Sequence, residues 1–400
     1  MSEQLSVFDM YGIDFASPFV EADESNEQEE DVTQTGIDDI GEMAISGTDW
    51  TTETIVRQIE KGNIILDPEF QRREAWTPVR KSRFIESLLL GFPVPQIILA
   101  ESKEKRRKFI VIDGKQRLVS LKQFMQGGSS PLKLRGLEVR KDLNGKTYQQ
   151  MLDSGFEGDI DLLCNQPIRT VVVKNWPSVE VLYRIFLRLN TGSVGLSPQE
   201  LRQALYPGEF IKYVNEYSIK SKALQRILKQ KNGRPDFRMR DIEMLIRFMA
   251  FQYFAKDYTG SMQLFLDETC KKLNAKWESH SSEIKDKAEQ FDKASDTAYK
   301  IFDKNAFTKY KNGQYESRIN RAVMDVMLFY FADETIRHAA EQESAKIKEA
   351  YEKLCATDEK FIDAIEQTTK SMNAVSYRFK KWAEVLGTCL STPVTSPWRE

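Results

Sequence analysis

The sequence predicts an α+β protein, in which a small mixed domain is followed by an all-helical one. Its 400 residues are enough for two or three domains. Runs of β-branched residues with the length of a strand occur only before Pro177, whereas beyond it apolar residues recur at helical spacing. We therefore expect a flexible acidic arm over residues 1–48, an α+β domain over residues 49–206 and a helical domain over residues 207–400.

Charge is divided unevenly between the arm and the rest of the chain. The first 56 residues contain 15 Asp and Glu, and the first basic residue is Arg57. The remaining residues hold 58 Lys and Arg against 45 Asp and Glu, a balance of +13 that the overall charge of −2 conceals. A basic body favours partners that carry phosphate. The arm is too polar over residues 20–48 to form a core, and its apolar start over residues 5–19 either stays unstructured or docks on a partner or on the body.

Strands and helices alternate in the predicted mixed domain. Three strands are expected, at residues 96–100, 108–113 and 167–174, and the first two form a hairpin. One helix begins at Thr77 and Pro78 and ends at Gly91, because Thr is a good N-cap and Pro fits the first helical position. A second helix covers residues 118–126 and ends at the following glycines.

The second predicted domain consists of helices only. Its first helix starts with the capping box S-P-Q-E, in which Ser197 and Glu200 bond to each other's backbone. Other helices beyond Pro177 are expected at residues 179–189, 242–254, 261–273, 283–302, 316–333, 339–354 and 360–386.

Cysteine usage and hydropathy indicate the compartment. The four cysteines form no C-x-x-C pair, which argues against a zinc or redox motif and fits reduced thiols in a cytoplasmic protein. The N-terminal residues lack the basic and apolar regions of a secretory signal, and no apolar segment approaches the roughly 20 residues of a membrane span. We expect a cytoplasmic protein that has no membrane partner.

The segment Asp113–Arg117 (D-G-K-Q-R) is the first candidate site. A strand ends at Asp113, Gly114 permits a tight turn and a helix begins at once, so backbone N–H groups converge beside Lys115, Gln116 and Arg117. Such a turn binds anions, because the helix dipole and the free amides both favour negative charge. Arg117 offers a fork that matches two phosphate oxygens, and Asp113 is suited to hold Mg²⁺ or to orient a water. A polar turn without a ligand is the alternative.

Two further polar segments become candidate site residues only in combination with the Asp113–Arg117 segment. The loop over residues 67–73 (D-P-E-F-Q-R-R) places Gln71 and Arg72 near two acids and just before a helix. The segment over residues 186–192 (F-L-R-L-N-T-G) places Arg188 and Asn190 at a helix end. Taken alone, each is explained by ordinary surface polarity.

The order of these segments resembles the N-terminal domain of GmrSD-type restriction enzymes. The shared pattern spans residues 51–206 and consists of P-x-F-Q-R-x-x-x-W, S-L-L-L-G-F-P-V-P, V-I-D-G-K-Q-R-L and F-L-R-L-N-T-G-S-V-G-L-S-P-Q-E-L-R. The chain departs from the family at Lys115, where the family most often has Gln. The resemblance implies a ParB/sulfiredoxin-like nucleotide-binding fold, used in bacterial defence against foreign and often modified DNA.

The resemblance also assigns roles to individual residues. The family motif is tied to binding and hydrolysis of a nucleoside triphosphate, and Asp113, Gly114, Gln116 and Arg117 match it. We expect Asp113 and Gln116 to be catalytic, with Asp113 also holding Mg²⁺. The nucleotide-binding set is then expected to be Gly114, Lys115, Arg117, Gln71, Arg72, Arg188 and Asn190.

Family members commonly carry or recruit an HNH nuclease, which needs a general-base histidine. The chain has only His280 and His338, and neither lies in a nuclease-like motif, so we expect both to be surface or helix-face residues. We therefore expect a separate HNH nuclease subunit as a partner and no nuclease activity in this chain.

A basic segment is the candidate surface for DNA. Residues 220–240 hold eight basic residues and one acid, and a second cluster, K-E-K-R-R-K, lies at residues 103–108. Clusters of this kind bind phosphates without reading sequence, although a solvated helix face is the alternative explanation. The residues expected to contact DNA are Lys220, Lys222, Arg226, Lys229, Lys231 and Arg234.

The sequence thus predicts a DNA-sensing component of a restriction-like defence system that binds and hydrolyses a nucleoside triphosphate. The alternative is a non-catalytic DNA-binding or adaptor protein, in which the nucleotide only switches the conformation. The sequence leaves open whether the chain is an enzyme.

Overall fold

A computed structural model describes residues 43–66, 76–103, 107–128, 131–179, 181–183, 185, 197–229, 235–236, 238–366 and 371–398. Most of the predicted arm over residues 1–48, including its apolar start, lies outside the described residues. Its expected end is wrong by several residues, because strand β1 (Ala44–Thr51) already begins at Ala44. The error arose because A-I-S-G-T-D contains few β-branched residues, while its partner strand supplies the hydrogen bonds that make it extended.

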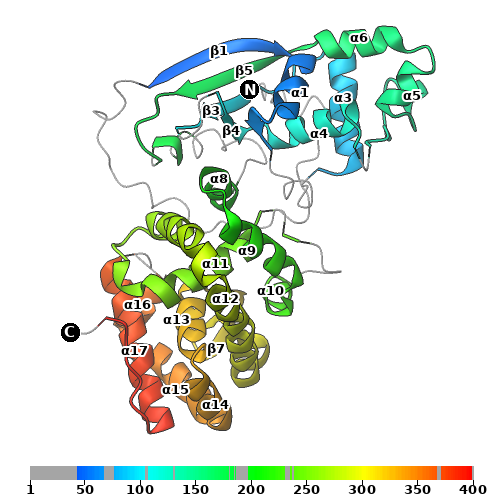
Figure 1. Ribbon diagram of the computed structural model, residues 1–400. Helices are drawn as coiled ribbons and strands as arrows, with labels where there is room; N and C mark the ends of the chain where they lie inside the picture. Colours follow the sequence, from blue (N-terminus) through cyan, green and yellow to red (C-terminus); the bar gives the residue numbers. More distant parts are fainter. Residues whose placement is uncertain are drawn as a thin grey trace, which may run out of the picture. The chain divides into compact units, whose positions relative to one another are not determined.

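The mixed domain is built on a five-stranded sheet of order β1-β5-β3-β4-β2 (Figure 1). Its other strands are β2 (Ile64–Ile65), β3 (Ile97–Glu101), β4 (Phe109–Asp113) and β5 (Pro167–Lys174). The predicted hairpin is confirmed, since β3 pairs with β4 in antiparallel fashion, while β3 and β5 are parallel. β1 lies antiparallel to β5 at one edge of the sheet.

Alternation along β3 and β4 divides the domain into two cores. Ile97, Leu99 and Val111 point to one face, where helices α1 (Thr52–Glu60), α3 (Pro78–Leu89), α4 (Lys115–Met125) and α6 (Glu157–Asn165) contribute to the first core. Short helices η3 (Lys141–Leu143) and α5 (Tyr148–Leu152) lie between α4 and α6 in the chain. Ile98, Ala100, Ile110 and Ile112 belong to the second core, which they share with α8 (Pro198–Leu205). The two cores follow directly from the period of two along each strand.

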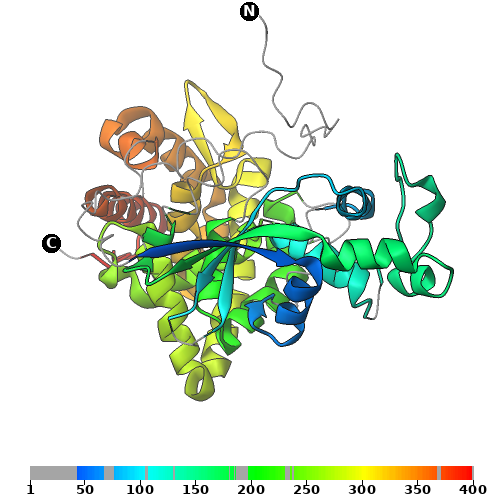
Figure 2. The ribbon, with the colours of Figure 1, turned by 90° about the horizontal axis from the view of Figure 1, so that it is seen from above.

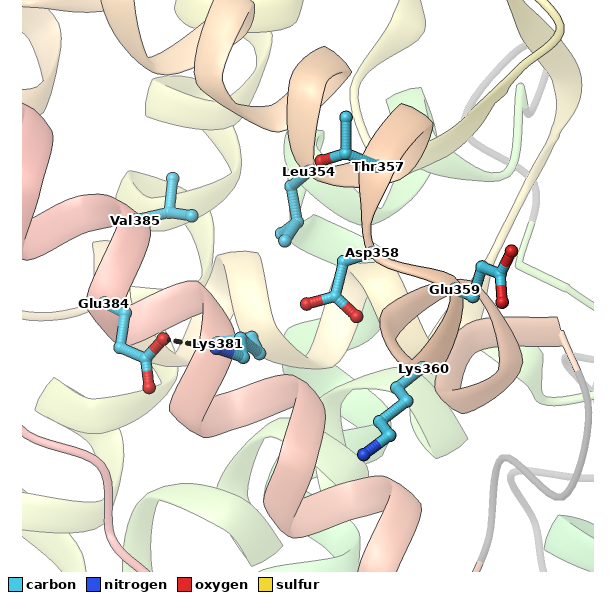
Figure 3. A pocket seen from close by; sticks show the side chains of 8 residues that line it. All are labelled: Leu354, Thr357, Asp358, Glu359, Lys360, Lys381, Glu384 and Val385. Atoms are coloured by element: carbon cyan, nitrogen blue, oxygen red, sulfur yellow. Dashed lines mark hydrogen bonds and ion pairs between the residues drawn. The ribbon is translucent and has the colours of Figure 1, made fainter.

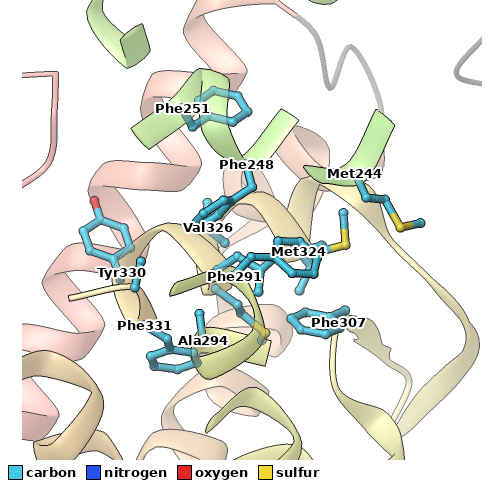
Figure 4. Packing of buried hydrophobic residues seen from close by; sticks show 14 of the residues in the cluster. Met244, Phe248, Phe251, Phe291, Ala294, Phe307, Met324, Val326, Tyr330 and Phe331 are labelled. Atoms are coloured by element: carbon cyan, nitrogen blue, oxygen red, sulfur yellow. The ribbon is translucent and has the colours of Figure 1, made fainter. Parts of the chain in front are cut away.

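The C-terminal half is largely helical. Its helices are α9 (Glu209–Lys220), α10 (Lys222–Ile227), α11 (Arg240–Phe254), α12 (Met262–Phe302), α13 (Arg321–Phe331), α14 (Glu334–Gln342), α15 (Ser344–Thr357), α16 (Glu359–Glu366) and α17 (Met372–Leu390), with 3₁₀ turns at Ala255–Asp257 and Asp303–Asn305. They enclose one large core, part of which is shown in Figure 4, where Phe248 meets Phe291 edge to face at 5.5 Å.

The prediction of an all-helical second domain is wrong at one place. Strands β6 (Thr308–Lys311) and β7 (Gln314–Ile319) form an antiparallel hairpin, drawn as yellow arrows in Figure 2. The turn contains Asn312 and Gly313, both with positive φ, which is the hairpin signal that the helical period had obscured. The helix expected from residue 316 therefore begins only at Arg321.

Helix boundaries differ from the prediction at several other places, among them residues 360–386, where α16 and α17 stand in place of one expected helix. The helices expected at residues 261–273 and 283–302 are the single long helix α12, interrupted at His280, where φ is −128° and ψ is 18°. The helix expected at residues 339–354 is divided at Glu343 into α14 and α15.

A buried ionic cluster lies inside the helical core. Both carboxylate oxygens of Asp325 accept hydrogen bonds from Arg247, at 2.6 Å and 2.7 Å, and Oδ2 also accepts one from Arg378 at 3.2 Å. All three side chains are buried. Because a buried charge is costly without a partner, the cluster links α11, α13 and α17 in one arrangement.

The cysteines are free, as the spacing predicted. Cys270, Cys355 and Cys389 are buried and Cys164 is half-buried. Burial raises the pKa of the Cys270 thiol to about 12, so this thiol stays protonated near neutral pH. In the part of the chain that is described, no helix combines the length and apolarity that a bilayer crossing requires.

Candidate functional site

The turn between β4 and α4 has the geometry that the D-G-K-Q-R segment predicts. Asp113 ends β4, Gly114 is the N-cap and Lys115 begins α4. Gly114 has φ of 95°, and a Cβ there would lie 3.1 Å from Ile97 and 3.2 Å from Arg117 Nη2. Glycine is therefore favoured both by the left-handed conformation and by the close approach of its neighbours.

The first turn of α4 presents backbone donors to a ligand. Its first helical hydrogen bond runs from the N–H of Leu118 to the carbonyl of Gly114, so the three preceding amides have no acceptor within the helix. Gly114 has no side chain to cap them. These donors and the positive end of the helix dipole make this terminus suitable for an anion.

Arg117 is held in a fixed orientation beside the turn. Its Nη2 donates to Asp113 Oδ2 at 2.8 Å and to the carbonyl of Gln96 at 2.9 Å, and the side chain is only 8% exposed. Its buried Nε has no hydrogen-bond partner among the residues that the structure describes. A buried guanidinium donor without a partner is costly, so an acceptor at this place is favoured.

Asp113 offers one carboxylate to a metal ion. Its side chain is 17% exposed, and Oδ2 already accepts a hydrogen bond from Arg117. Within the described ranges, no group of three or more acidic, histidine or cysteine side chains is arranged to hold a metal. A Mg²⁺ ion at Asp113 would therefore take most of its ligands from phosphate oxygens and water, as Mg²⁺ does in many nucleotide sites.

Lys115 differs from the expectation of an open phosphate ligand. Its side chain is 4% exposed, and its ammonium forms an ion pair with Oε1 of Glu200 on α8. The other oxygen, Oε2, accepts the N–H of Ser197 at 2.6 Å, which confirms the predicted capping box. A phosphate at α4 would have to compete with Glu200 for this ammonium.

Gln116 connects the turn to the chain just before α3. Its Oε1 accepts the N–H of Trp76 at 3.3 Å, and Trp76 is the tryptophan that follows the Gln71 and Arg72 segment. The remaining predicted members of the pocket, Gln71, Arg72, Arg188 and Asn190, lie outside the described residues.

The basic segment proposed for DNA is exposed where it is described. Lys220, Lys222, Arg226 and Lys229 are all exposed at the ends of α9 and α10, whereas Lys231 and Arg234 lie outside the described residues. Arg226 lies 3.7 Å from Asp296 and covers the ring of Tyr299.

The second basic cluster is less available than its sequence indicates. Lys103 donates to the carbonyl of Pro177 and Lys108 to that of Gly62, at 2.6 Å and 2.8 Å. Both lysines therefore already donate hydrogen bonds to backbone carbonyls of the mixed domain.

Both histidines lie on the surface, as expected. His280 is exposed at the break in α12 and shares a hydrogen bond with Ser279, while His338 is exposed beside Glu334.

A cavity of about 530 Å³ opens among α15, α16 and α17 (Figure 3). Lys381 pairs with Glu384 at 2.7 Å, and the hydroxyl of Tyr377 donates to both oxygens of Asp358. None of the predicted site residues that the structure describes lines it; its walls are Leu354, Thr357, Asp358, Glu359, Lys360, Lys381, Glu384 and Val385.

Glu200 belongs to the site, although the sequence motifs do not predict it there. The local sequence predicts only a helix cap for this residue, because its partner Lys115 lies 85 residues away and no local pattern links the two. The one available signal was an unusual run of polar residues in α8 (P-Q-E-L-R-Q-A-L), where an amphipathic helix would need only one polar face.

The fold and the turn define an α+β domain with a candidate anion site at the N-terminus of α4. Residues 52–207 match the family model described as GmrSD restriction endonuclease, N-terminal domain. This match confirms, over residues 52–207, the resemblance that the sequence motifs predict. Comparisons with curated proteins and with solved structures gave no match.

Proposed function

We propose that this chain is the nucleotide-binding, NTP-hydrolysing and DNA-sensing component of a bacterial restriction-like defence system, and that a separate HNH nuclease subunit cuts the DNA. The proposal depends most on the turn at Gly114, where the first amides of α4 have no acceptor within the helix and the buried Nε of Arg117 has no partner among the described residues. The family match supplies the restriction context.

The phosphates would bind at the first turn of α4. The amides of this first turn would donate to phosphate oxygens, and Gly114 would let the ligand approach the backbone closely. The guanidinium of Arg117, already oriented by Asp113, would add a charge-assisted hydrogen bond. Bound through Asp113, Mg²⁺ would neutralise charge on the phosphates.

Hydrolysis would transfer the terminal phosphoryl group to water. The bond from water oxygen to the γ-phosphorus forms while the bond from that phosphorus to the β–γ bridging oxygen breaks, which releases inorganic phosphate and a nucleoside diphosphate. Asp113 would orient the water and accept hydrogen bonding from it, and Gln116 would orient the attacking or leaving oxygen. Since the chemistry needs mainly positioning, a rigid turn suits it.

A nucleotide-dependent switch without hydrolysis is the second candidate. It is favoured by the ion pair between Lys115 and Glu200, because this pair ties the proposed phosphate site to α8. A nucleotide that binds beside Lys115 would change this ion pair whether or not the nucleotide is hydrolysed.

Steady-state phosphate release with each nucleoside triphosphate, with and without duplex DNA, tests the proposal. We expect release that DNA stimulates and that Asp113→Asn reduces by roughly a hundredfold or more, as expected for loss of a group that positions the nucleophile. Asp153→Asn, which changes an exposed aspartate, is the matched control and should leave the rate unchanged. Binding without release would select the switch, and absence of binding would reject both candidates.

The acidic arm provides a test of DNA binding. Its negative charge is opposite to that of the remaining chain, which has a balance of +13, so deleting residues 1–48 should raise affinity for DNA of any sequence at low salt. Because residues 44–48 belong to β1, the sharper variant deletes residues 1–42 only. The gain should shrink as salt rises and the Debye length falls to about 8 Å at physiological ionic strength.

Fluorescence anisotropy on a random duplex over a salt series measures this effect. A truncated chain that binds no more tightly at low salt would show that the arm does not mask the body. Its apolar start at residues 5–19 would then be the better candidate for contact with a partner.

A further inference from the structure

Helix α8 buries an unusual number of polar side chains. Gln199, Glu200, Arg202 and Gln203 are each 5% exposed or less, within a helix of eight residues. Leu201 and Leu205, on the same helix, join the core on the second face of the sheet. Apolar side chains such as these two leucines are enough to hold α8 against the sheet. Buried polar side chains need specific partners, so they fix one arrangement of the helix at a cost in stability.

One end of this polar set reaches the proposed nucleotide site. The carboxylate of Glu200 binds the ammonium of Lys115 with one oxygen and the backbone N–H of Ser197 with the other. The same carboxylate therefore holds the first residue of α4 and closes the N-terminal cap of α8.

The other end reaches the long helix of the helical half. Nε of Arg202 donates to Oδ1 of Asp267 at 2.6 Å, and both side chains are 2% exposed. Nη1 of Arg202 donates to Gln199 at 2.6 Å. Burial disfavours the charged guanidinium, but electrostatic interaction with Tyr183 and Asp267 outweighs this and raises the pKa of Arg202, so the guanidinium keeps its charge.

We infer that Lys115 and Glu200 are positioning residues of the proposed nucleotide site, and that α8 couples phosphate binding at α4 to α12. The inference depends on the proposed function, since it names how that site is regulated. Phosphate at the first turn of α4 brings negative charge beside Lys115 and competes with Glu200 for its ammonium. Glu200 then loses its buried counter-charge and the cap of α8 weakens, which alters the helix that carries Arg202.

By thermodynamic linkage, an effect of phosphate on the Lys115–Glu200 pair implies an equal effect of the pair on phosphate affinity. If phosphate binding weakens the pair, then weakening the pair must strengthen phosphate binding by the same factor. Glu200→Gln removes the competing charge while keeping an acceptor for Ser197. We therefore expect this variant to bind a triphosphate about tenfold more tightly, which corresponds to a coupling of about 1.4 kcal/mol.

The test combines calorimetric titration with amide hydrogen exchange on the full chain. The probes are inorganic tripolyphosphate, which is independent of the base, and non-hydrolysable analogues of the four common nucleoside triphosphates. In the wild-type chain, ligand should speed exchange of the α8 amides over residues 201–205 by about tenfold, because the cap that protects them weakens. Lys115→Arg keeps the positive charge and should retain this response, whereas Lys115→Gln should lose it.

The matched control is Glu209→Gln, which breaks an exposed Glu–Lys pair with Lys212 on α9 and should change neither affinity nor α8 exchange. If the probes bind the wild-type chain but leave α8 exchange unchanged, the inference is overturned while the proposed function stands. This exchange result needs no variant, so it decides the question even if Glu200→Gln fails to fold. If no probe binds the wild-type chain or Glu200→Gln, the proposed function fails and the inference fails with it.

Discussion

Replacing Arg117 by alanine is expected to weaken nucleotide binding roughly ten- to a hundredfold, because a charge-assisted hydrogen bond of about 1.5–3 kcal/mol is lost. The substitution also frees Asp113 and the carbonyl of Gln96 from their present donor. Both acceptors lie near the surface of the turn and can bind water, so the fold should survive. Calorimetric titration of folded wild-type and variant proteins measures the effect.

Arg117→Lys is the informative companion to this variant. A lysine keeps the charge but lacks the planar fork that reaches Asp113 and a phosphate together, so it should recover only part of the affinity. Equal nucleotide affinity in the wild-type and Arg117→Ala proteins would show that the turn at Gly114 does not bind the phosphates.

Replacing Asp325 by alanine should destabilise the helical half by about 3–5 kcal/mol, since it leaves two buried guanidinium groups without their shared carboxylate. The affected side chains, Arg247 and Arg378, come from α11 and α17, so several helices lose a common contact. Thermal and urea unfolding followed by circular dichroism measure the loss.

The matched control is Asp257→Ala, which removes an aspartate from an exposed pair with Lys272. Exposed pairs contribute about 0–1 kcal/mol, so its unfolding midpoint should stay close to that of the wild type. Similar midpoints for the Asp325 and Asp257 variants would mean that the buried cluster adds little to stability.

Local patterns were sufficient to predict the middle of the sheet and most helices. The β-branched runs of β3, β4 and β5 and the cap at Thr77 all appear as the sequence indicates. The local patterns do not predict the edge strands β1 and β2 or the hairpin β6–β7. Strand β2 has only two residues, while β1 and the hairpin are polar and take their conformation from a partner strand. Strand preference depends strongly on such context.

The candidate site was predictable only in its local part. The Gly114 turn follows from five consecutive residues, and the structure has it as expected. The pairing of Lys115 with Glu200 depends on how α8 lies against β4, which no local pattern encodes. The charge of Lys115 is visible in the sequence and favours a phosphate ligand, whereas the sequence does not show which carboxylate neutralises that charge.

The break at His280 divides α12 into two halves, so the direction of the apolar face in one half does not fix that in the other. Apolar residues such as Phe265 and Leu273 face the core before it, and Ala288 and Phe291 face the core after it. One residue added inside either half would rotate the following stripe by about 100° and turn apolar side chains toward water. At a position that is already non-helical, the chain can absorb such a rotation. Changes in the length of α12 are therefore best tolerated at this break, which leaves each half free to keep its own register.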